Sequence, residues 1–490
     1  MIKYKFDSRD WKIFSAITII SLLYIFPIIL SGRYYIDDLG RSIAGYSSWG
    51  IDGRPLADLV MLILNSGMPL VDLSPLTQIL AVTSISYALT LYAKKYFHSI
   101  DWISTSFACF LFIGSPFFIE NLSYKYDSIT MALSASFLIL IFASVERGYS
   151  KWIISSILIL SSLCLYQATI GLFVILSCIE SIDTIRDKSS KIKNAFIALA
   201  LRALALLAAF LIYKLCILKI FAQGTYQNLR SGTVPVNSLF IEKLKDNVQH
   251  YMEWLINPFV ESIPLYADII YTAIYLIFII NIYRSNDKGR LLRSVLVFVL
   301  IFISIPFFFI HVVILNNPAF VPRVLVSFCG SMLLFGYVLL NSGVGRRYLP
   351  YVLSPVIYFC FFYVNAYSSA SSAQNRSDQL IASSLYYDIS HSGVSFDDTA
   401  VIGSLPESDQ RKLTAWKLPL TSGLIPLYMA NGWWSNEFMK HYRIDLKATA
   451  PSEEDRKAAC SIKPFAKTKD YNLYMNERRL IIDFTMDSCS

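Results

Sequence analysis

The sequence predicts an α-helical, polytopic membrane protein with a small C-terminal domain. Hydrophobic residues make up 55% of the 490 positions and charged residues only 16%, and the mean hydropathy is +0.50. A soluble globular protein of this length does not bury so much apolar surface, whereas a bilayer accommodates it. The net charge of +8 does not indicate nucleic-acid binding, because most basic residues lie in short loops between apolar segments, where they set the topology.

A membrane-spanning helix needs about 20 mostly apolar residues to cross a hydrocarbon core of about 30 Å. Apolar windows predict eleven spans, near residues 13–31, 76–93, 102–119, 128–145, 152–165, 168–182, 196–220, 266–283, 294–312, 324–342 and 349–366. The two spans on either side of Tyr166-Gln167 are short. They are either one bent helix or a pair of helices that meet near the outer face.

Basic residues predict the orientation of these spans. Every segment that would face the cytoplasm with an inside N-terminus is basic, and Lys94-Lys95 is one example. The outer loops hold few cations, which are Arg33, Arg41, Arg54, Lys125 and Arg323. The positive-inside bias therefore predicts a cytoplasmic N-terminus and, with an odd number of spans, a C-terminus on the outer side. The first span has no small-residue cleavage site after it and is predicted to be an uncleaved anchor.

A second domain is predicted after the last span. The membrane domain covers residues 1–366, and the C-terminal domain covers residues 367–490, where the composition becomes mixed. The stretch Ser-Ser-Ala-Ser-Ser-Ala-Gln-Asn at 368–375 is expected to be a polar linker. The local patterns predict a small α/β or α+β fold with a helix at 379–389, a strand at 399–403 and a hairpin of 471–474 with 480–484.

Two features of the C-terminal domain leave alternatives open. Trp433-Trp434 could stack on a sugar ring, but the pair also suits the core of the domain or a membrane interface. Cys460 and Cys489 are predicted to form a disulfide if this domain lies in an oxidising compartment. The other six cysteines lie in apolar spans and are expected to act as small hydrophobic residues. The five histidines are scattered, and no Cys/His spacing resembles a zinc site.

The first outer loop, residues 32–75, holds the densest group of charges. It contains Asp37, Asp38, Arg41, Asp52, Arg54, Asp58 and Asp72. Adjacent carboxylates near a low-dielectric boundary disfavour each other's ionisation, so one of them is a candidate general base. Arginine forks nearby suit phosphate oxygens. The alternative is a solvated acidic loop or a helix cap. Leu56–Leu64 is too short to span and is expected to lie along the interface or to enter a cavity.

Three further outer segments supply candidate binding residues. Lys125 and Asp127 lie in the loop after the third span, where Asp127 could instead cap a helix. Arg323 lies at the outer end of a span, against the charge bias, and is either a phosphate ligand or a cation that extends to lipid headgroups. Tyr166-Gln167 interrupts an apolar run, and this pair either lines a cavity or packs against another helix.

These motifs together resemble the bacteriophage serotype-converting O-antigen glucosyltransferases. The resemblance is strong in the first 180 residues and weaker from there to about residue 366. It rests on Tyr35–Ser42, Gly45-Tyr46, Trp49-Gly50, Asp52–Ala57, Ser123–Ser128 and Leu165–Ala168.

The resemblance implies a GT-C-like fold and a lipid-linked substrate pair. The donor would be undecaprenyl-phosphate-glucose, and the acceptor would be a lipid-linked O-antigen repeat of lipopolysaccharide at the periplasmic face of the inner membrane. A synthase that makes the carrier-linked glucose and a flippase that brings it outward are the implied functional partners. No cofactor and no metal are expected, although the acidic pair could bind a divalent cation.

The resemblance also assigns roles to residues. Asp37 is expected to be the general base and Asp38 to orient the acceptor or tune its neighbour, and the two roles could be exchanged. Arg41, Arg54, Lys125 and Arg323 are the candidate ligands of the donor phosphate. Further substrate contacts are expected from Tyr35, Tyr124, Asp127, Tyr166 and Gln167. A single displacement would invert the anomeric centre.

Two other classes remain as alternatives. A transporter or flippase of a lipid-linked sugar would use such charges as a pathway, but no inverted repeat is visible in the sequence. A glycan polymerase or ligase would use a large late outer loop, for which residues 222–264, with Tyr226, Arg230 and Trp254, are the candidate.

Overall fold

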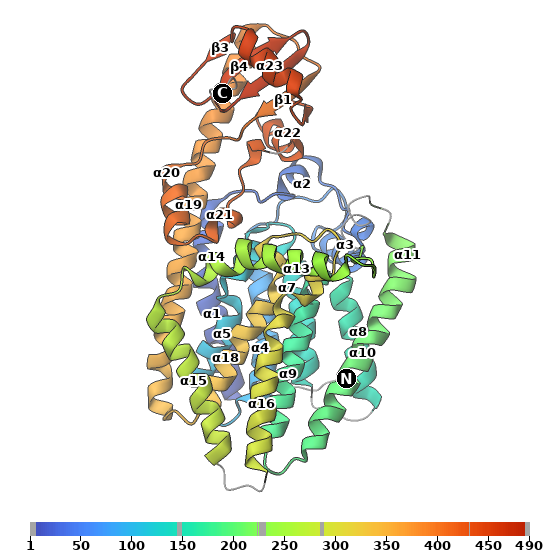
Figure 1. The fold of residues 1–490 in the computed structure, drawn as a ribbon, viewed down its shortest axis with the longest axis vertical. Helices are drawn as coiled ribbons and strands as arrows, with labels where there is room; N and C mark the ends of the chain where they lie inside the picture. Colours follow the sequence, from blue (N-terminus) through green and yellow to red (C-terminus); the bar gives the residue numbers. More distant parts are fainter. Residues whose placement is uncertain are drawn as a thin grey trace. The chain divides into compact units, whose positions relative to one another are not determined.

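The computed structural model describes residues 6–144, 149–222, 224, 232–284, 289–430 and 432–485. The chain is mostly helical and divides into two compact units (Figure 1). The membrane unit comprises Met1–Ile29, Ser47–Gly67 and Leu73–Asn365. The C-terminal unit comprises Leu30–Tyr46, Met68–Asp72 and Ala366–Ser490. The first predicted outer loop is therefore divided between the two units, and the main boundary lies at 365/366.

Seven helices among the described residues are long and apolar enough to cross a membrane. They are α1 (Ser8–Ser31), α4 (Leu76–Tyr96), Gln167–Arg186 with α9 (Ile170–Arg186), Ile192–Phe221 with α10 (Ile192–Ile212) and α11 (Leu218–Phe221), Ala267–Arg284 in α15 (Leu265–Arg284), Arg290–Val313 with α16 (Arg290–Ser304) and α17 (Ile310–Val313), and Arg346–His391 with α19 (Leu349–Ser392). The helices α5 (Trp102–Ile113) and α6 (Pro116–Ser123), bent by 65°, make an eighth if they are counted as one span.

The sequence predicts eleven spans, whereas seven or eight helices of the described residues are long and apolar enough to cross a membrane. Three predicted spans, 128–145, 152–165 and 324–342, correspond to shorter helices. These are α7 (Ser128–Ala143), α8 (Tyr149–Leu163) and α18 (Val326–Asn341), with 16, 15 and 16 residues. At 1.5 Å per residue, each is about 24 Å long or slightly less. α7 packs against α4 and α8, and α18 packs against α5 and α9.

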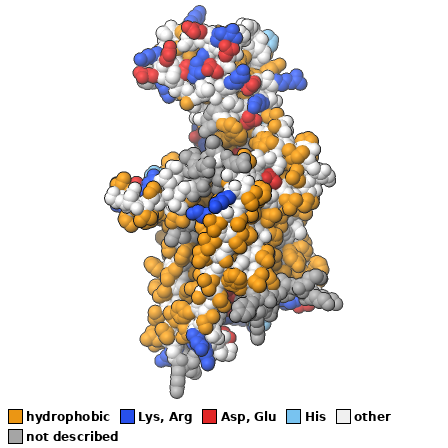
Figure 2. Space-filling model, turned by 90° about the vertical axis from the view of Figure 1, so that its right-hand side faces the viewer, with side chains coloured by type: hydrophobic (Ala, Val, Ile, Leu, Met, Phe, Trp, Pro, Cys, Tyr) orange, Lys and Arg blue, Asp and Glu red, His pale blue; other side chains and the backbone are white. Residues whose placement is uncertain are grey.

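Apolar side chains cover the outside of the membrane unit, as a bilayer requires. Figure 2 shows one face on which hydrophobic side chains cover the helices, whereas charged side chains gather on the C-terminal unit. α10 and α16 expose large apolar residues, including Leu204, Leu207, Phe298 and Phe302. Inside the unit, Arg202 Nε lies 2.8 Å from Glu180 Oε2, so these two buried charges form a pair.

The C-terminal unit begins with the later part of α19, a helix of 44 residues. The expected linker at 368–375 is wrong, because this stretch lies within that helix. It contains neither Gly nor Pro, and Ser368, Ala370, Ser371 and Gln374 are buried, so packing favours the helix over a polar coil. The predicted helix at 379–389 is confirmed as part of α19.

A five-stranded sheet in the order β2-β1-β5-β4-β3 forms the centre of this unit. β1 (Asp398–Ile402) runs parallel to β2 (Ala448–Thr449) and β5 (Arg479–Asp483). β4 (Asn472–Asn476) is antiparallel to β5 and to β3 (Ala466–Lys467). The predicted strand at 399–403 and the predicted hairpin are confirmed, and Glu477, with φ +53°, lies in the left-handed region at the turn.

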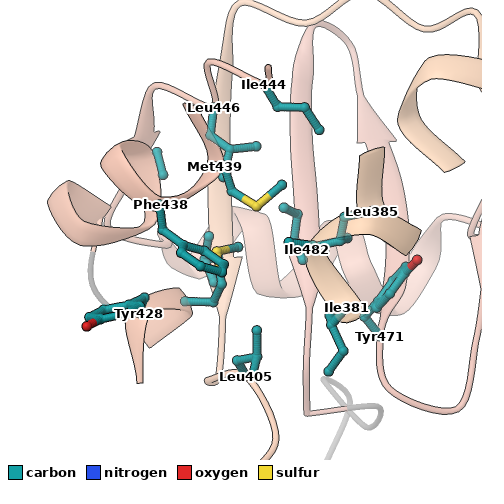
Figure 3. Close-up of a cluster of buried hydrophobic side chains, with 14 of the residues drawn as sticks. Ile381, Leu385, Leu405, Tyr428, Phe438, Met439, Ile444, Leu446, Tyr471 and Ile482 are labelled. Atoms are coloured by element: carbon teal, nitrogen blue, oxygen red, sulfur yellow. The ribbon is translucent and has the colours of Figure 1, made fainter. Parts of the chain in front are cut away.

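Side chains alternate between the two faces of the sheet. Val401 and Ile482 face a cluster that also contains Ile381 and Leu385 of α19 and Leu39 of α2 (Asp38–Ala44), part of which Figure 3 shows. On the opposite face, β-strand residues pack against α23 (Glu453–Ser461). The remaining helices of the unit are α20 (Asp409–Lys417), α21 (Thr421–Leu424) and α22 (Gly432–Lys440). Leu39 thus belongs to the core of the C-terminal unit.

The cysteines follow the predicted pattern with one exception. Of the six in apolar segments, five are buried and Cys216 is exposed. Cys460, in α23, is disulfide-bonded. Its predicted partner, Cys489, lies outside the described residues, and so do Tyr226 and Arg230.

Candidate functional site

The predicted site residues fall into two groups, one in each unit, and each group is described by itself. The C-terminal unit holds Tyr35, Asp37, Asp38 and Arg41. The membrane unit holds a larger group of cations, aromatic residues and polar residues, namely Arg54, Tyr124, Lys125, Asp127, Tyr166, Gln167 and Arg323.

The acidic pair lies at the start of the short helix α2. Asp38 is fully buried, at 0% exposure, and its Oδ2 accepts the backbone N–H of Tyr35 at 3.2 Å. Asp37 is half-buried and occupies the N-cap position, but its side chain makes no capping hydrogen bond. The helix-cap interpretation is therefore wrong for Asp37. Asp38 stabilises its own turn, whereas Asp37 is the more accessible of the two carboxylates.

The backbone just before the pair is strained. Ile36 has φ +47°, in the left-handed region that a β-branched residue rarely occupies. Such a conformation costs about 1–3 kcal/mol and persists only where its surroundings hold it. Ile36 and Tyr35 are both buried, and the Tyr35 hydroxyl donates to the carbonyl of Leu424 at 3.0 Å. The packing of the C-terminal unit thus fixes the turn that carries Asp37.

Arg41 lies in the same helix, one turn after the acids. It is buried, and its guanidinium carbon lies 5.7 Å from the centre of the Tyr46 ring. Gly45 ends the helix with φ +60°, a conformation that glycine adopts without penalty. A Cβ at Gly40 would lie 3.0 Å from the Tyr46 hydroxyl and 3.3 Å from the Glu437 carboxylate, so these side chains would have to shift slightly to admit it.

In the membrane unit, two of the predicted cations, Arg54 and Arg323, contact aromatic rings in one continuous network. The Arg54 guanidinium carbon lies 5.5 Å from the ring centre of Tyr166. The Tyr166 hydroxyl donates to the carbonyl of Arg323 at 3.1 Å, and the Arg323 guanidinium carbon lies 5.6 Å from the ring centre of Tyr124. Lys125 follows Tyr124 directly, and its carbonyl accepts a hydrogen bond from Thr77. The structure therefore brings residues of three distant segments together.

Arg323 is bound within this network by a carboxylate. Its Nη1 lies 2.6 Å from Glu120 Oε1, and its backbone N–H donates to Glu120 Oε2 at 2.7 Å. The Glu120 side chain is 1% exposed and that of Arg323 17%. Glu120 therefore holds the mostly buried Arg323 side chain inside the unit. The pairing was not predicted, although a carboxylate at the end of an apolar span signals a need for a cation.

Arg54 differs from Arg323 in having an unused donor. Within the described part of the chain, its buried Nε has no hydrogen-bond partner. It precedes α3 (Pro55–Leu64), and Pro55 occupies the first helical turn, where its missing N–H costs nothing. α3 confirms the predicted short apolar helix, which at about 15 Å is too short to span. A guanidinium with an open N–H is suited to an anionic ligand.

Polar side chains hold the loop that carries Arg54. Gln167 Nε2 donates to the carbonyl of Asp52 at 2.9 Å and to the Tyr213 hydroxyl at 2.8 Å, and that hydroxyl donates to the carbonyl of Gly53 at 3.0 Å. Asp58 accepts the N–H of Trp49 at 3.0 Å. Gln167 therefore packs against this loop in addition to any substrate role. Nothing in the sequence indicated Tyr213, which lies in an apolar segment.

Asp127 takes part in the same arrangement. It occupies the N-cap position of α7 but makes no capping hydrogen bond, so the predicted capping alternative is wrong. Instead, the indole Nε1–H of Trp49 donates to Asp127 Oδ1. Both residues lie in segments that carry the resemblance, yet their pairing could not be predicted from spacing.

No group of three or more His, Cys, Asp or Glu side chains that could hold a metal ion occurs in the described ranges. Most of the cations and acids proposed from the sequence are instead engaged with aromatic rings, backbone groups or each other, as described above.

Comparison with known proteins identifies the family. Residues 26–336 match the glucosyl transferase GtrII family, a range that includes the acidic pair and the cation–aromatic network. The chain is also 29% identical over 459 residues to the "uncharacterized 55.3 kDa protein in gtrB 5′ region" of Salmonella phage P22, covering 90% of this chain and 93% of the relative. No solved structure matches the chain. These matches confirm the resemblance to the phage serotype-converting enzymes, and the chain belongs to the glucosyl transferase GtrII family.

Proposed function

We propose that this glucosyltransferase transfers glucose from undecaprenyl-phosphate-glucose to lipid-linked O-antigen repeats at the periplasmic face of a bacterial inner membrane. Membership of the family supports glucosyl transfer, and the apolar helices support catalysis at a membrane. The single observation that carries the choice of a phosphate-linked donor is the network in which Arg54, Arg323 and the segment of Lys125 converge.

The donor phosphate gains negative charge as its bond to C1 of glucose breaks. Cations at that oxygen stabilise the transition state more than the ground state. Arg54 is the leading candidate, because its buried Nε–H has no hydrogen-bond partner among the described residues, and Lys125 is the second, because its side chain is partly exposed. Arg323 is already paired with Glu120 and is assigned mainly to holding the network together. Arg41 remains a fourth candidate from the C-terminal unit.

The acceptor hydroxyl needs a base as its oxygen attacks C1. Asp37 accepts the proton, the new oxygen–C1 bond forms, and the bond between C1 and the phosphate oxygen breaks, releasing undecaprenyl phosphate. Asp37 is preferred over Asp38 because it is half-exposed, whereas Asp38 is buried and bonded to the Tyr35 N–H. One displacement of this kind inverts the anomeric centre. Tyr35, Tyr124, Asp127, Tyr166 and Gln167 are proposed to shape the binding surfaces.

This chemistry requires no metal or other cofactor, and a chelator is expected to leave transfer unchanged. A transporter or flippase remains the alternative function. Glucosyl transfer is preferred, because the matched family is defined by bond formation to glucose. A synthase for the carrier-linked glucose and a flippase are the proposed functional partners.

The test is the structure of the O-antigen in cells that express this chain. Mass and linkage analysis would compare the unaltered chain with Asp37→Asn and Arg54→Gln at equal membrane levels, in hosts with and without a synthase for carrier-linked glucose. We expect an added hexose only with the synthase and the unaltered chain. Modification that persists without the synthase would refute the donor, and no modification in any acceptor strain would favour transport.

A further inference from the structure

The C-terminal unit holds the chain on both sides of the acidic pair. Before the pair, Arg33 Nη2 donates to Asp378 Oδ2 at 2.8 Å and to the carbonyl of Pro426 at 2.6 Å. After the pair, His441 Nε2 lies 3.2 Å from the carbonyl of Leu39. Between these points, the Tyr35 hydroxyl bonds Leu424, as described above. The acids therefore lie on a short segment that is fixed at both ends.

The ion pair of Arg33 and Asp378 is the most deeply buried part of this attachment. Their side chains are 3% and 1% exposed. Gln374 Nε2 donates to the second oxygen of Asp378 at 2.7 Å, so the carboxylate is bonded on both sides. A buried ion pair with such partners is directional, and removal of one member leaves an uncompensated charge.

Tyr428 completes the environment of Arg33. The guanidinium carbon lies 4.4 Å from the centre of the Tyr428 ring, and the Tyr428 hydroxyl donates to the carbonyl of Tyr34. Burial raises the pKa of Tyr428 to about 12, so the hydroxyl keeps its proton as a donor. In Figure 3 this ring lies at the edge of the hydrophobic cluster, with its oxygen pointing away from Phe438. The core of the C-terminal unit thus connects directly to the segment that carries the acids.

We propose that the Arg33–Asp378 ion pair is a clamp that positions the Asp37–Asp38 segment against the C-terminal unit. Arg33 and Asp378 are then positioning residues, and their catalytic importance rests on the proposed function of Asp37. A base must lie within hydrogen-bond reach of the attacking hydroxyl, and a displacement of about 1 Å can lower a rate by about 10²-fold.

The experiment measures the position of the segment separately from activity. A cysteine is introduced at Leu39, which is buried and lies on the clamped segment, and in a second protein at Leu446, which is buried in the same core but outside that segment. Maleimide labelling of each site is followed by peptide-resolved mass spectrometry on the purified full-length chain. With Arg33→Gln, we expect labelling at position 39 to rise about tenfold or more through local opening, while position 446 stays protected.

Transfer to O-antigen by Arg33→Gln without the added cysteines is expected to fall about 10²-fold. Arg478→Gln is the matched control, because Arg478 and Asp397 form an exposed pair in the same unit, with side chains 69% and 66% exposed. It should change neither labelling nor transfer. Arg33→Lys keeps the charge but loses the planar fork, so partial rescue of both readouts is expected.

The clamp would be overturned if Arg33→Gln left the labelling at position 39 unchanged. It would also be overturned if Arg33→Gln raised this labelling but left transfer to O-antigen unchanged. A third result would also overturn the clamp: an equal rise in labelling at positions 39 and 446 in Arg33→Gln, in Arg33→Lys and in the double variant Arg33→Gln/Asp378→Asn. The ion pair would then only stabilise the fold of the whole unit. Selective labelling without transfer by any form, including the unaltered chain, would support the clamp and count against the proposed function.

Discussion

The membrane unit and the C-terminal unit differ in the charge that each concentrates among the predicted site residues. The membrane unit holds Arg54 and Arg323 against tyrosine rings, whereas the C-terminal unit carries Asp37 and Asp38 beside a strained residue, Ile36. In the proposed reaction, cations serve the leaving phosphate and a carboxylate serves the attacking hydroxyl. The proposed phosphate ligands and the proposed base belong to different units, so substitutions in one unit can test one half of the proposed chemistry.

The largest effect is expected from the acid in the C-terminal unit. Asp37→Asn removes the base without changing its volume and should lower hexose addition by about 10²–10⁴-fold. Asp38→Asn keeps an oxygen that can accept the Tyr35 N–H, so it should retain most of the transfer. Linkage analysis of O-antigen at matched expression measures both. If Asp38→Asn were the inactive variant, the two roles would be exchanged.

The next effect separates two arginines of the membrane unit. Arg54→Gln removes a cation from the leaving phosphate and should lower transfer by about 10²-fold with little loss of stability. Arg323→Gln leaves Glu120 buried without its cation and should cost about 3–5 kcal/mol of stability. Thermal unfolding of the purified protein and transfer at equal membrane levels distinguish them. A stable, inactive Arg323→Gln protein would instead make Arg323 a direct phosphate ligand.

A smaller effect is expected where the membrane unit holds its own loop. Trp49→Phe keeps most of the ring packing but removes the indole donor to Asp127, at a cost of about 1–3 kcal/mol for a buried acceptor. Transfer should fall by about tenfold, while the exposed control Trp102→Phe should behave as the unaltered protein. Equal behaviour of the two variants would show that the hydrogen bond does not hold the loop.

The contact between Leu39 of α2 and His441, which directly follows α22, should make the C-terminal unit sensitive to acid. Burial lowers the pKa of His441 below its ordinary 6.5, so the folded unit binds fewer protons there than the unfolded chain. This contribution is complete above about pH 6.5 and is lost as the pH falls through the folded pKa. The difference between the thermal unfolding midpoints at neutral and at acidic pH should be smaller for His441→Gln than for the control His391→Gln. Parallel pH profiles would contradict this assignment.

The last prediction concerns stability alone and distinguishes two neighbouring arginines of the sheet. Arg479 bonds Asp398 at 2.6 Å and Asp455 at 2.8 Å, and Asp455 is buried. Burial raises the pKa of Asp455, but hydrogen bonds from Arg479 and Ser452 outweigh it and hold the pKa below its ordinary value. Arg479→Gln should cost about 1.5–3 kcal/mol. Arg478→Gln, at an exposed pair, should leave the unfolding midpoint unchanged, and a loss as large as that of Arg479→Gln would refute the difference.

Local patterns predicted the elements in which apolar and polar residues alternate regularly along the chain. The strand at 399–403 and the hairpin of 471–474 with 480–484 follow from alternation and a turn. The helix at 379–389 was predicted, but its continuation through 368–375 was not, because serine and alanine are compatible with either state until packing buries one side. The short helices α7, α8 and α18 were read as full spans, since apolar composition alone does not reveal where a helix ends.

The sequence selects candidate site residues but not the partners that the structure gives them. Arg54, Lys125 and Arg323 were selected as cations on the outer side, against the positive-inside bias, and Asp37 was selected as one of two adjacent carboxylates. Their partners depend on contacts between distant segments, such as Arg323 with Glu120, and spacing carries no record of these. For the same reason, the sequence did not reveal that parts of the first outer loop belong to different units. Leu39 looked like part of a polar loop until the core of the C-terminal unit placed it against Ile381 and Leu385.

The C-terminal unit is assembled from both ends of the gene, since it joins Leu30–Tyr46 and Met68–Asp72 to Ala366–Ser490. A single crossover between two related genes that replaced only the codons of Ala366–Ser490 would leave Arg33 and Leu39 facing a foreign surface. New serotypes produced by recombination therefore have to inherit both ends together, or to arise from substitutions that spare these contacts. The history of such genes should show linked ancestry for two stretches separated by almost 300 codons.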